Sequence, residues 1–293
     1  MKKLVQIFVM ASLVFACADL AAAQEEAGHK PPKVLVITRE FVKPGKGGAT
    51  HEKAESLYVQ AMTRAKSPVH YIGMEGVSGR ARALFFAGYE SFDAWQTSEE
   101  AEQKDEALSA GLAHADAVDG ELLEGIDHTV WYLDEEGSYN TSVDLPHMRY
   151  FEIERFTLRQ GHEREWTDVV KLVKAAYAKA LPEMHWAMYA SVYGIASPAY
   201  LVIVPMKSGA DIDKAFADNP KFAAAMGEEG MKKLSELSAS SIESSETNLF
   251  AINPKMSYVG ADMVKADPEF WAPKASAPAA GAKKAGEKPA AKP

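Results

Sequence analysis

Two histidine–aromatic pairs occupy matching positions in the two halves of the chain and are the first candidates for chemistry. His70-Tyr71 and His185-Trp186 each lie just after a proline that ends a predicted helix, at the start of a predicted strand. Side chains alternate along a strand, so each histidine faces one side and its aromatic neighbour the other. An imidazole in an enclosed interior can titrate near neutral pH or bind a metal or haem iron. The alternative, which the sequence favours, is a histidine hydrogen-bonded to nearby backbone.

Arg39 and Arg155 form a second matched pair. Each shares its strand face with apolar residues. An unpaired buried charge is very costly, so each guanidinium needs a carboxylate or a ligand anion. We expect a structural ion pair, with binding of a substrate carboxylate as the alternative. The acidic residues nearest in sequence or in the predicted sheet are Glu40, Glu75, Glu152 and Glu154.

Aromatic and methionine residues around the predicted hairpins can line an apolar cavity, although such residues more often form ordinary core. Combined with the matched pairs, they define a candidate ligand-binding set. Its members are His70, Tyr71, His185, Trp186, Arg39, Arg155, Glu75 and Tyr189.

The remaining histidines show no metal-ligand spacing. His51 and His162 lie at predicted helix starts, where we expect solvated side chains. The sequence has no Gly-rich phosphate loop, nucleophile elbow or zincin motif. The sequence therefore does not identify catalytic residues; we predict no metal site and no cofactor, and haem is the one cofactor left open.

A duplicated plan of secondary structure positions these residues. In the first half we expect strands at 34–42, 69–77, 82–89 and 128–133, a helix capped by Thr50, and a long helical region from Ser91 to about Leu123. In the second half we expect strands at 148–158, 185–193, 199–206 and 247–252, with helices at 162–181, 211–216 and 220–242. Each half thus has the order β-α-β-β-α-β, the ferredoxin-like plan of one antiparallel sheet with its helices on one face.

The strand composition indicates sheets that are covered on both sides. Apolar residues stand on adjacent as well as alternate positions, as in Leu84-Phe85-Phe86. We therefore predict an α+β fold in which two ferredoxin-like units, 33–140 and 147–260, pack sheet to sheet as an intramolecular pseudo-dimeric α+β barrel. Residues 24–32 and 141–146 are predicted linkers.

The two ends of the chain differ in kind from this body. Residues 1–23 read as a signal peptide, which predicts a periplasmic or secreted protein without a transmembrane span in the mature chain. Cys17 is the only cysteine, and lipidation there is the alternative to cleavage near Ala23. Residues 261–293 are predicted to be an extension that ends in a disordered Ala/Pro/Lys-rich tail.

Charge argues against nucleic acid as a partner. The whole chain carries −9, the signal segment +1 and the tail from Ala272 onward +4, which leaves −14 on residues 24–271. Such an acidic body would repel phosphates.

The chain resembles the dimeric α+β barrel superfamily over residues 33–259, and within it the antibiotic-biosynthesis-monooxygenase and NIPSNAP-like families. The resemblance rests on the element order, on the Arg-x-x-x-x-x-Gly ending of each first strand, and on the helix start Ser91-Phe-Asp-Ala-Trp95. Members of the superfamily include cofactor-free monooxygenases acting on polycyclic aromatics, haem-degrading enzymes and small proteins without known activity, and the resemblance implies the same range of functions here. The Asn, Trp and His set of the haem-degrading members cannot be placed around His70 or His185.

The leading prediction is an exported tandem barrel protein, monomeric or homodimeric, that binds a small apolar or aromatic ligand in the barrel interior. One alternative is a monooxygenase-like enzyme that acts on an aromatic or haem-type substrate and uses His70 or His185 as a base or ligand. The other is a structural cell-envelope protein without a ligand.

Overall fold

The computed structural model describes residues 28–272. The predicted signal peptide, Cys17 and the tail beyond Ala272 lie outside the described residues. The first half of the chain forms β1 (Val34–Val42), α2 (Ala49–Ala65), β2 (Tyr71–Gly76), β3 (Arg82–Tyr89), α3 (Phe92–Lys104), α4 (Glu106–Asp119) and β4 (Leu123–Tyr139).

The second half repeats this order. It forms β5 (Tyr150–Leu158), α5 (Glu163–Ala180), β6 (Trp186–Tyr193), β7 (Ala199–Met206), α6 (Gly209–Ser241) and β8 (Ile242–Ile252). Two short helices follow the last strand, α7 (Ala261–Ala266) and α8 (Pro268–Trp271), and two 3-10 turns, η2 (Leu145–His147) and η3 (Pro254–Met256), lie in the connections.

The strands close into one antiparallel barrel in the order β1-β3-β2-β8-β5-β7-β6-β4. Each half contributes a four-stranded sheet, and the two sheets join edge to edge. One junction pairs β2 with β8 from Met74↔Ile252 to Gly76↔Phe250, and the other pairs β4 with β6. The predicted fold is confirmed: two ferredoxin-like units form a pseudo-dimeric α+β barrel within one chain.

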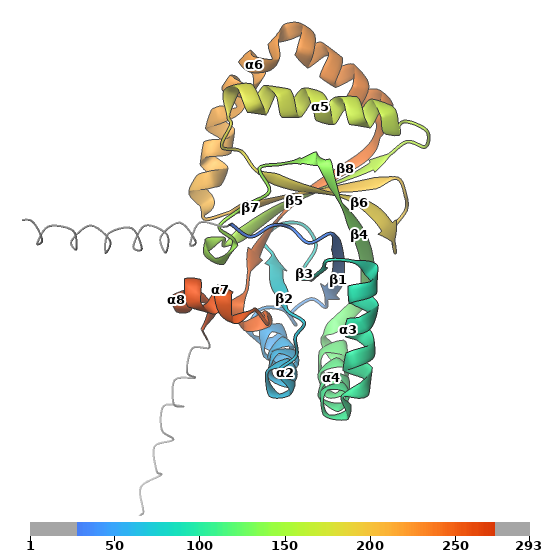
Figure 1. Ribbon diagram of the computed structural model, residues 1–293, viewed down its shortest axis with the longest axis vertical. Helices are drawn as coiled ribbons and strands as arrows, with labels where there is room; N and C mark the ends of the chain where they lie inside the picture. The colour runs from blue at the N-terminus through green and yellow to red at the C-terminus, as the bar shows by residue number, and fades with distance from the viewer. Residues whose placement is uncertain (1–27, 273–293) are drawn as a thin grey trace, which may run out of the picture.

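The barrel lies between two layers of helices, with α5 and α6 over the second sheet and α2, α3 and α4 over the first (Figure 1). Strand alternation explains this arrangement. In β1, Leu35 and Ile37 belong to the barrel core, which also contains Phe86, Phe151 and Phe250. The alternate residues of the second sheet instead pack against helix residues such as Trp166 and Val169. No helix within residues 28–272 has the length and apolarity needed to cross a lipid bilayer.

Two local predictions were wrong, and the structure adds detail to a third. Thr50 does not cap its helix, because α2 already begins at Ala49 after Gly48. The helical region after Ser91 is two helices, since Asp105 ends α3 and its side chain accepts a hydrogen bond from the Leu108 backbone at 2.9 Å. The helix over residues 209–241 is interrupted at Gly227 and continues through Pro220, where the predicted break lies. Gly227 has a φ of 71°, a backbone conformation that glycine adopts readily.

Candidate ligand cavity at one end of the barrel

A cavity of about 390 Å³ opens at one end of the barrel. Its walls come from the interior faces of both sheets, with Leu35 and Phe86 from the first unit and Phe151 and Ile203 from the second. Three connecting segments complete the enclosure, namely residues 29–32, 141–145 and 259–263. This volume and apolar lining are typical of small-molecule sites in proteins.

The two histidines of the matched pairs line this same cavity. His185 Nε2 donates to the Pro205 carbonyl oxygen at 2.8 Å, and its Nδ1 lies 3.5 Å from the Glu183 carbonyl oxygen. His70 lies at the exposed mouth, with its ring stacked on Tyr258 at a centroid distance of 5.1 Å. Within residues 28–272 the His70 ring makes no hydrogen bond, so both of its nitrogens are available to a ligand.

Tyr189 points inward, and its phenol is anchored across the cavity. Its side chain is 1% exposed, and its hydroxyl donates to the Pro32 carbonyl oxygen at 3.0 Å. Burial raises the pKa of this phenol well above its ordinary value, so it stays protonated and keeps donating. Tyr189 thereby ties residues 29–32 to β6.

Tyr71 and Trp186 border the cavity but direct their rings to the helix side of their sheets. The Tyr71 ring packs edge-on against Phe85, with centroids 6.0 Å apart. The Trp186 ring packs on Tyr139 and donates from Nε1 to the Gly137 carbonyl oxygen at 2.9 Å. The aromatic member of each matched pair therefore belongs mainly to the helix-facing core of its unit.

The segments over the cavity are held by polar contacts that the sequence did not indicate. Residues 29 and 143 form a backbone bridge, and His29 Nε2 lies 3.1 Å from Asp262 Oδ2. Burial opposes ionisation of Asp262, but the hydrogen bonds from His29 and from the Met263 backbone outweigh it and hold the pKa of Asp262 below its ordinary value. The N-terminal segment and the start of α7 are thus joined above the barrel.

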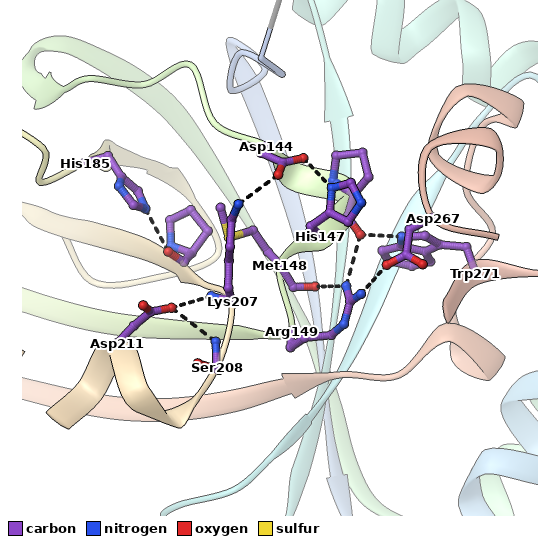
Figure 2. A network of polar contacts seen from close by, with 12 residues as sticks. Asp144, His147, Met148, Arg149, His185, Lys207, Ser208, Asp211, Asp267 and Trp271 are labelled. Atoms are coloured by element: carbon purple, nitrogen blue, oxygen red, sulfur yellow. Dashed lines mark hydrogen bonds and ion pairs between the residues drawn. The ribbon is translucent and has the colours of Figure 1, made fainter. Parts of the chain in front are cut away.

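Arg149 is the centre of a second group of contacts at this end (Figure 2). Its guanidinium donates to the Pro146 and Met148 carbonyl oxygens at 3.0 and 2.8 Å and pairs with Asp267. The Trp271 indole also donates to the Pro146 carbonyl oxygen, at 2.8 Å. These bonds fasten α7 and α8 to η2, and they place Met263 and Trp271 in the barrel core.

Arg39 and Arg155 lie away from these histidines. They line a separate small cavity of about 50 Å³, which also involves Thr129, Glu246 and Asn248. Arg39 forms a bidentate pair with Asp127 at 2.6 and 2.8 Å, and Arg155 Nη2 contacts Glu246 Oε2 at 3.1 Å. Both arginines pair with carboxylates, but none of the four glutamates suggested by the sequence is the partner. The partners come from strands adjacent to β1 and β5.

Two further expectations about single residues are corrected. Glu75 lines neither of these two cavities; it accepts a hydrogen bond from Asn253 Nδ2 at 3.0 Å on the helix side of β2. His51 is not solvated, because it is 1% exposed between α2 and the first sheet. The eight residues predicted as one ligand site therefore lie in different places. The larger barrel cavity is lined by His70, Tyr71, His185, Trp186 and Tyr189. Arg39 and Arg155 line the smaller cavity, and Glu75 lines neither.

A third cavity, of about 680 Å³, lies outside the barrel between the second sheet and helices α5 and α6. Aromatic residues such as Tyr177 and Phe222 line it together with Glu152 and Glu154. Burial and the nearby charge of Glu152 raise the pKa of Glu154. This space belongs to one unit only, whereas the barrel-end cavity receives equivalent residues from both.

Strand order and closure identify the architecture. The protein has the dimeric α+β barrel fold, with both ferredoxin-like units in one chain. No family model and no curated protein sequence matches this barrel.

Solved structures with a similar fold include three from bacteria. A candidate monooxygenase from Fusobacterium nucleatum is 12% identical, with 75% of this chain and 91% of that chain covered at a TM-score of 0.49. A mutant chlorite dismutase from Candidatus Nitrospira defluvii is 10% identical, with 85% and 99% covered at a TM-score of 0.45. A haem-binding protein from Thermus thermophilus is 13% identical, with 78% and 95% covered at a TM-score of 0.44.

Proposed function

We propose that this barrel protein binds a small apolar or aromatic molecule in the barrel-end cavity, where His70 and His185 orient it. The observation that supports the proposal is the convergence of two imidazoles from equivalent positions on a cavity with otherwise largely apolar walls. Apolar walls supply affinity by removing ligand surface from water, and a few placed polar groups supply orientation.

The size of the cavity sets an expected affinity. A ligand of about 15 non-hydrogen atoms that gains roughly 0.3–0.5 kcal/mol per atom would bind with a Kd of roughly 3–500 μM. His185 would contact a ligand from Nδ1, which also lies 3.5 Å from the Glu183 carbonyl oxygen, because its Nε2 is already engaged by Pro205. His70 can donate or accept at the mouth. A phenol, naphthol or similar ring carrying one polar group matches these features.

Haem fits this cavity poorly. The Nε2 of His185 is engaged by the Pro205 carbonyl, and His70 lies at the exposed mouth. Lys30 is the only lysine or arginine among the described lining residues, whereas haem carries two propionates that need positive partners.

Fluorescence titration with anilinonaphthalene sulfonate tests the site. Ala187 lines the cavity from β6, and Ala187→Phe should fill part of it and weaken binding by at least about tenfold. The matched control, Val192→Phe, adds a ring to an exposed position of the same strand and should change the Kd by less than about twofold. Absence of saturable binding, or an equal Kd for A187F and the parent chain, would refute the proposal. An equal Kd would instead point to the cavity under α6.

The role of the histidines is tested separately with 2-naphthol as a polar aromatic probe. His70→Ala with His185→Ala should weaken binding by about 10- to 100-fold, the effect of losing two hydrogen bonds. His114→Ala, at an exposed position on α4, is the control. Unchanged binding in the double variant would leave an apolar cavity whose histidines play no part in recognition.

A further inference from the structure

Four ionisable side chains meet in the interior of the first unit, on the helix side of its sheet. Glu40 comes from β1, His51 and Glu55 from successive turns of α2, and Asp119 is the last residue of α4. Their side chains are between 1% and 5% exposed. This group, here called the acidic–histidine cluster, is separate from the ligand cavity, because none of the four lines it.

The cluster has more acceptors than its donors can satisfy. His51 Nε2 lies 3.0 Å from Glu40 Oε2, 3.3 Å from Asp119 Oδ1 and 3.6 Å from Glu55 Oε1. One N–H makes one good hydrogen bond, here to Glu40. Glu55 Oε1 and Asp119 Oδ1 are buried and have no hydrogen-bond partner among the described residues. Both of these oxygens face the imidazole nitrogen.

The charges in the cluster are also out of balance. Within residues 28–272 the salt bridges of its three carboxylates involve only His51, and no lysine or arginine. Even with a protonated imidazole the ionised cluster would carry −2, and burying that charge is very costly. Either protons or a bound cation must reduce this charge; a divalent ion held by a neutral imidazole and three carboxylates would leave −1.

The geometry suits a small cation. Around an ion with tetrahedral ligands at about 2.1 Å, neighbouring ligand atoms lie about 3.4 Å apart. The distances from His51 Nε2 to the three carboxylate oxygens, 3.0, 3.3 and 3.6 Å, scatter about that value. The four candidate ligand atoms all lie within 4.8 Å of one another.

The second unit shows that the fold does not require polar groups at this position. Phe156 follows Arg155 in β5 as Glu40 follows Arg39 in β1. The Phe156 ring packs on Trp166 of α5, with centroids 4.7 Å apart. An apolar contact therefore fills the space between first strand and first helix in one unit, and the acidic–histidine cluster fills it in the other.

We propose that Glu40, His51, Glu55 and Asp119 form a closed binding site for a divalent first-row transition-metal ion. One imidazole with three carboxylates matches the nitrogen and oxygen preference of Zn²⁺, Mn²⁺ or Fe²⁺. Mg²⁺ and Ca²⁺ favour oxygen ligands alone and more of them, and soft Cu⁺ favours sulfur. The burial of all four side chains leaves no position open to a substrate, so the ion is structural and joins β1, α2 and α4.

Without an ion the same residues would have to hold protons. Burial and the charges of Glu40 and Asp119 raise the pKa of Glu55 to about 10. Burial lowers the pKa of His51, but its carboxylate partners outweigh that effect and raise it to about 9. A proton-sharing cluster is therefore the competing state, and metal binding must be measured directly.

The test uses the untagged full chain. Metal content after purification is measured by mass spectrometry, and chelator-treated protein is titrated with Zn²⁺, Mn²⁺, Co²⁺ and Mg²⁺ by calorimetry and by thermal unfolding. We expect one equivalent of a transition ion, a lower Tm after chelation that one equivalent restores, and no response to Mg²⁺. If none of the three transition ions binds and chelation leaves the Tm unchanged, the proposal is overturned.

Isosteric variants locate the site. Glu55→Gln and Asp119→Asn each remove one ligand charge and should weaken binding by more than about 100-fold, because even indirect supporting contacts of metal ligands are worth 10–100-fold. Glu52→Gln is the control; it lies on the same helix but pairs with Lys255 outside the cluster, and its affinity should match the parent chain. Parent-like affinity in both E55Q and D119N would overturn the assignment. If neither variant folds, the d–d absorption of Co²⁺ in the parent chain decides between nitrogen–oxygen coordination and none.

Discussion

Trp271 fastens α8 over the end of the barrel, and Trp271→Ala should release this segment locally. The side chain is 4% exposed and belongs to the barrel core, and its indole donates to the Pro146 carbonyl oxygen at 2.8 Å. Truncation of a buried tryptophan costs about 3–5 kcal/mol. Because α7 and α8 follow the last barrel strand, they can detach while all eight strands stay paired.

The loss should therefore appear as local opening and not as global unfolding. A cost of about 3 kcal/mol corresponds to a roughly 150-fold larger population of the open segment. Amide hydrogen exchange followed by mass spectrometry should show that change in residues 261–271. Protection in β1 and β5 should change by less than about tenfold.

The matched control is Trp95→Ala, which removes a half-buried indole from α3. It should leave exchange in 261–271 unchanged. Equal loss of protection in every strand of the W271A variant would show that the segment and the barrel unfold together. Unchanged exchange in 261–271 would show that Trp271 does not anchor it. Either result refutes the reasoning.

Two more predictions concern the barrel itself. Burial raises the pKa of Glu246, but a hydrogen bond from Asn248 and the charges of Arg82 and Arg155 outweigh it and hold that pKa below its ordinary value. Stability from this carboxylate is present above its unfolded pKa and is lost as the pH falls through the folded value. Glu246→Gln should therefore lower the free energy of unfolding in urea by at most about 1 kcal/mol at pH 7, because the side chain is partly exposed. The loss should be smaller at pH 3, and an equal loss at both pH values would contradict this reasoning. Gly73→Ala should lower the free energy of unfolding by about 1–3 kcal/mol in the same assay, because the new Cβ would lie 2.2 Å from the Met256 carbonyl oxygen. Parent-like stability would show that η3, which contains Met256, moves to make room.

The architecture was predictable because it depends on patterns that repeat along the chain. The two Arg-x-x-x-x-x-Gly strand endings, and the prolines at 68 and 182, mark the same points in both units. Alternation along β2 places Ile72 and Met74 in the barrel core, and along β6 it does the same for Ala187 and Tyr189. A period of two along a strand is local information, which a sequence carries directly.

The cluster and the ion-pair partners were not predictable in the same way. His51 was expected in solvent because it begins a helix, yet Glu55 stands four residues later on the same helical face. That spacing was a usable signal. The other two members, Glu40 and Asp119, reach the cluster only through the packing of β1 and α4. Likewise, Asp127 becomes the partner of Arg39 because β4 pairs with β1 in a register that places them opposite each other.

The junction of two units in one chain removes a constraint that symmetry imposes on an assembly of identical subunits. A barrel built from two copies of one sequence must carry every substitution twice. Here the space that holds Glu40 and His51 in one half holds Phe156 and Trp166 in the other. The two histidines of the cavity likewise differ, since His185 is fixed by Pro205 while His70 stands at the mouth. Covalent linkage thus lets one half hold ionisable groups at a position that the other half fills with aromatic rings, and any ligand that enters the barrel meets two unlike walls.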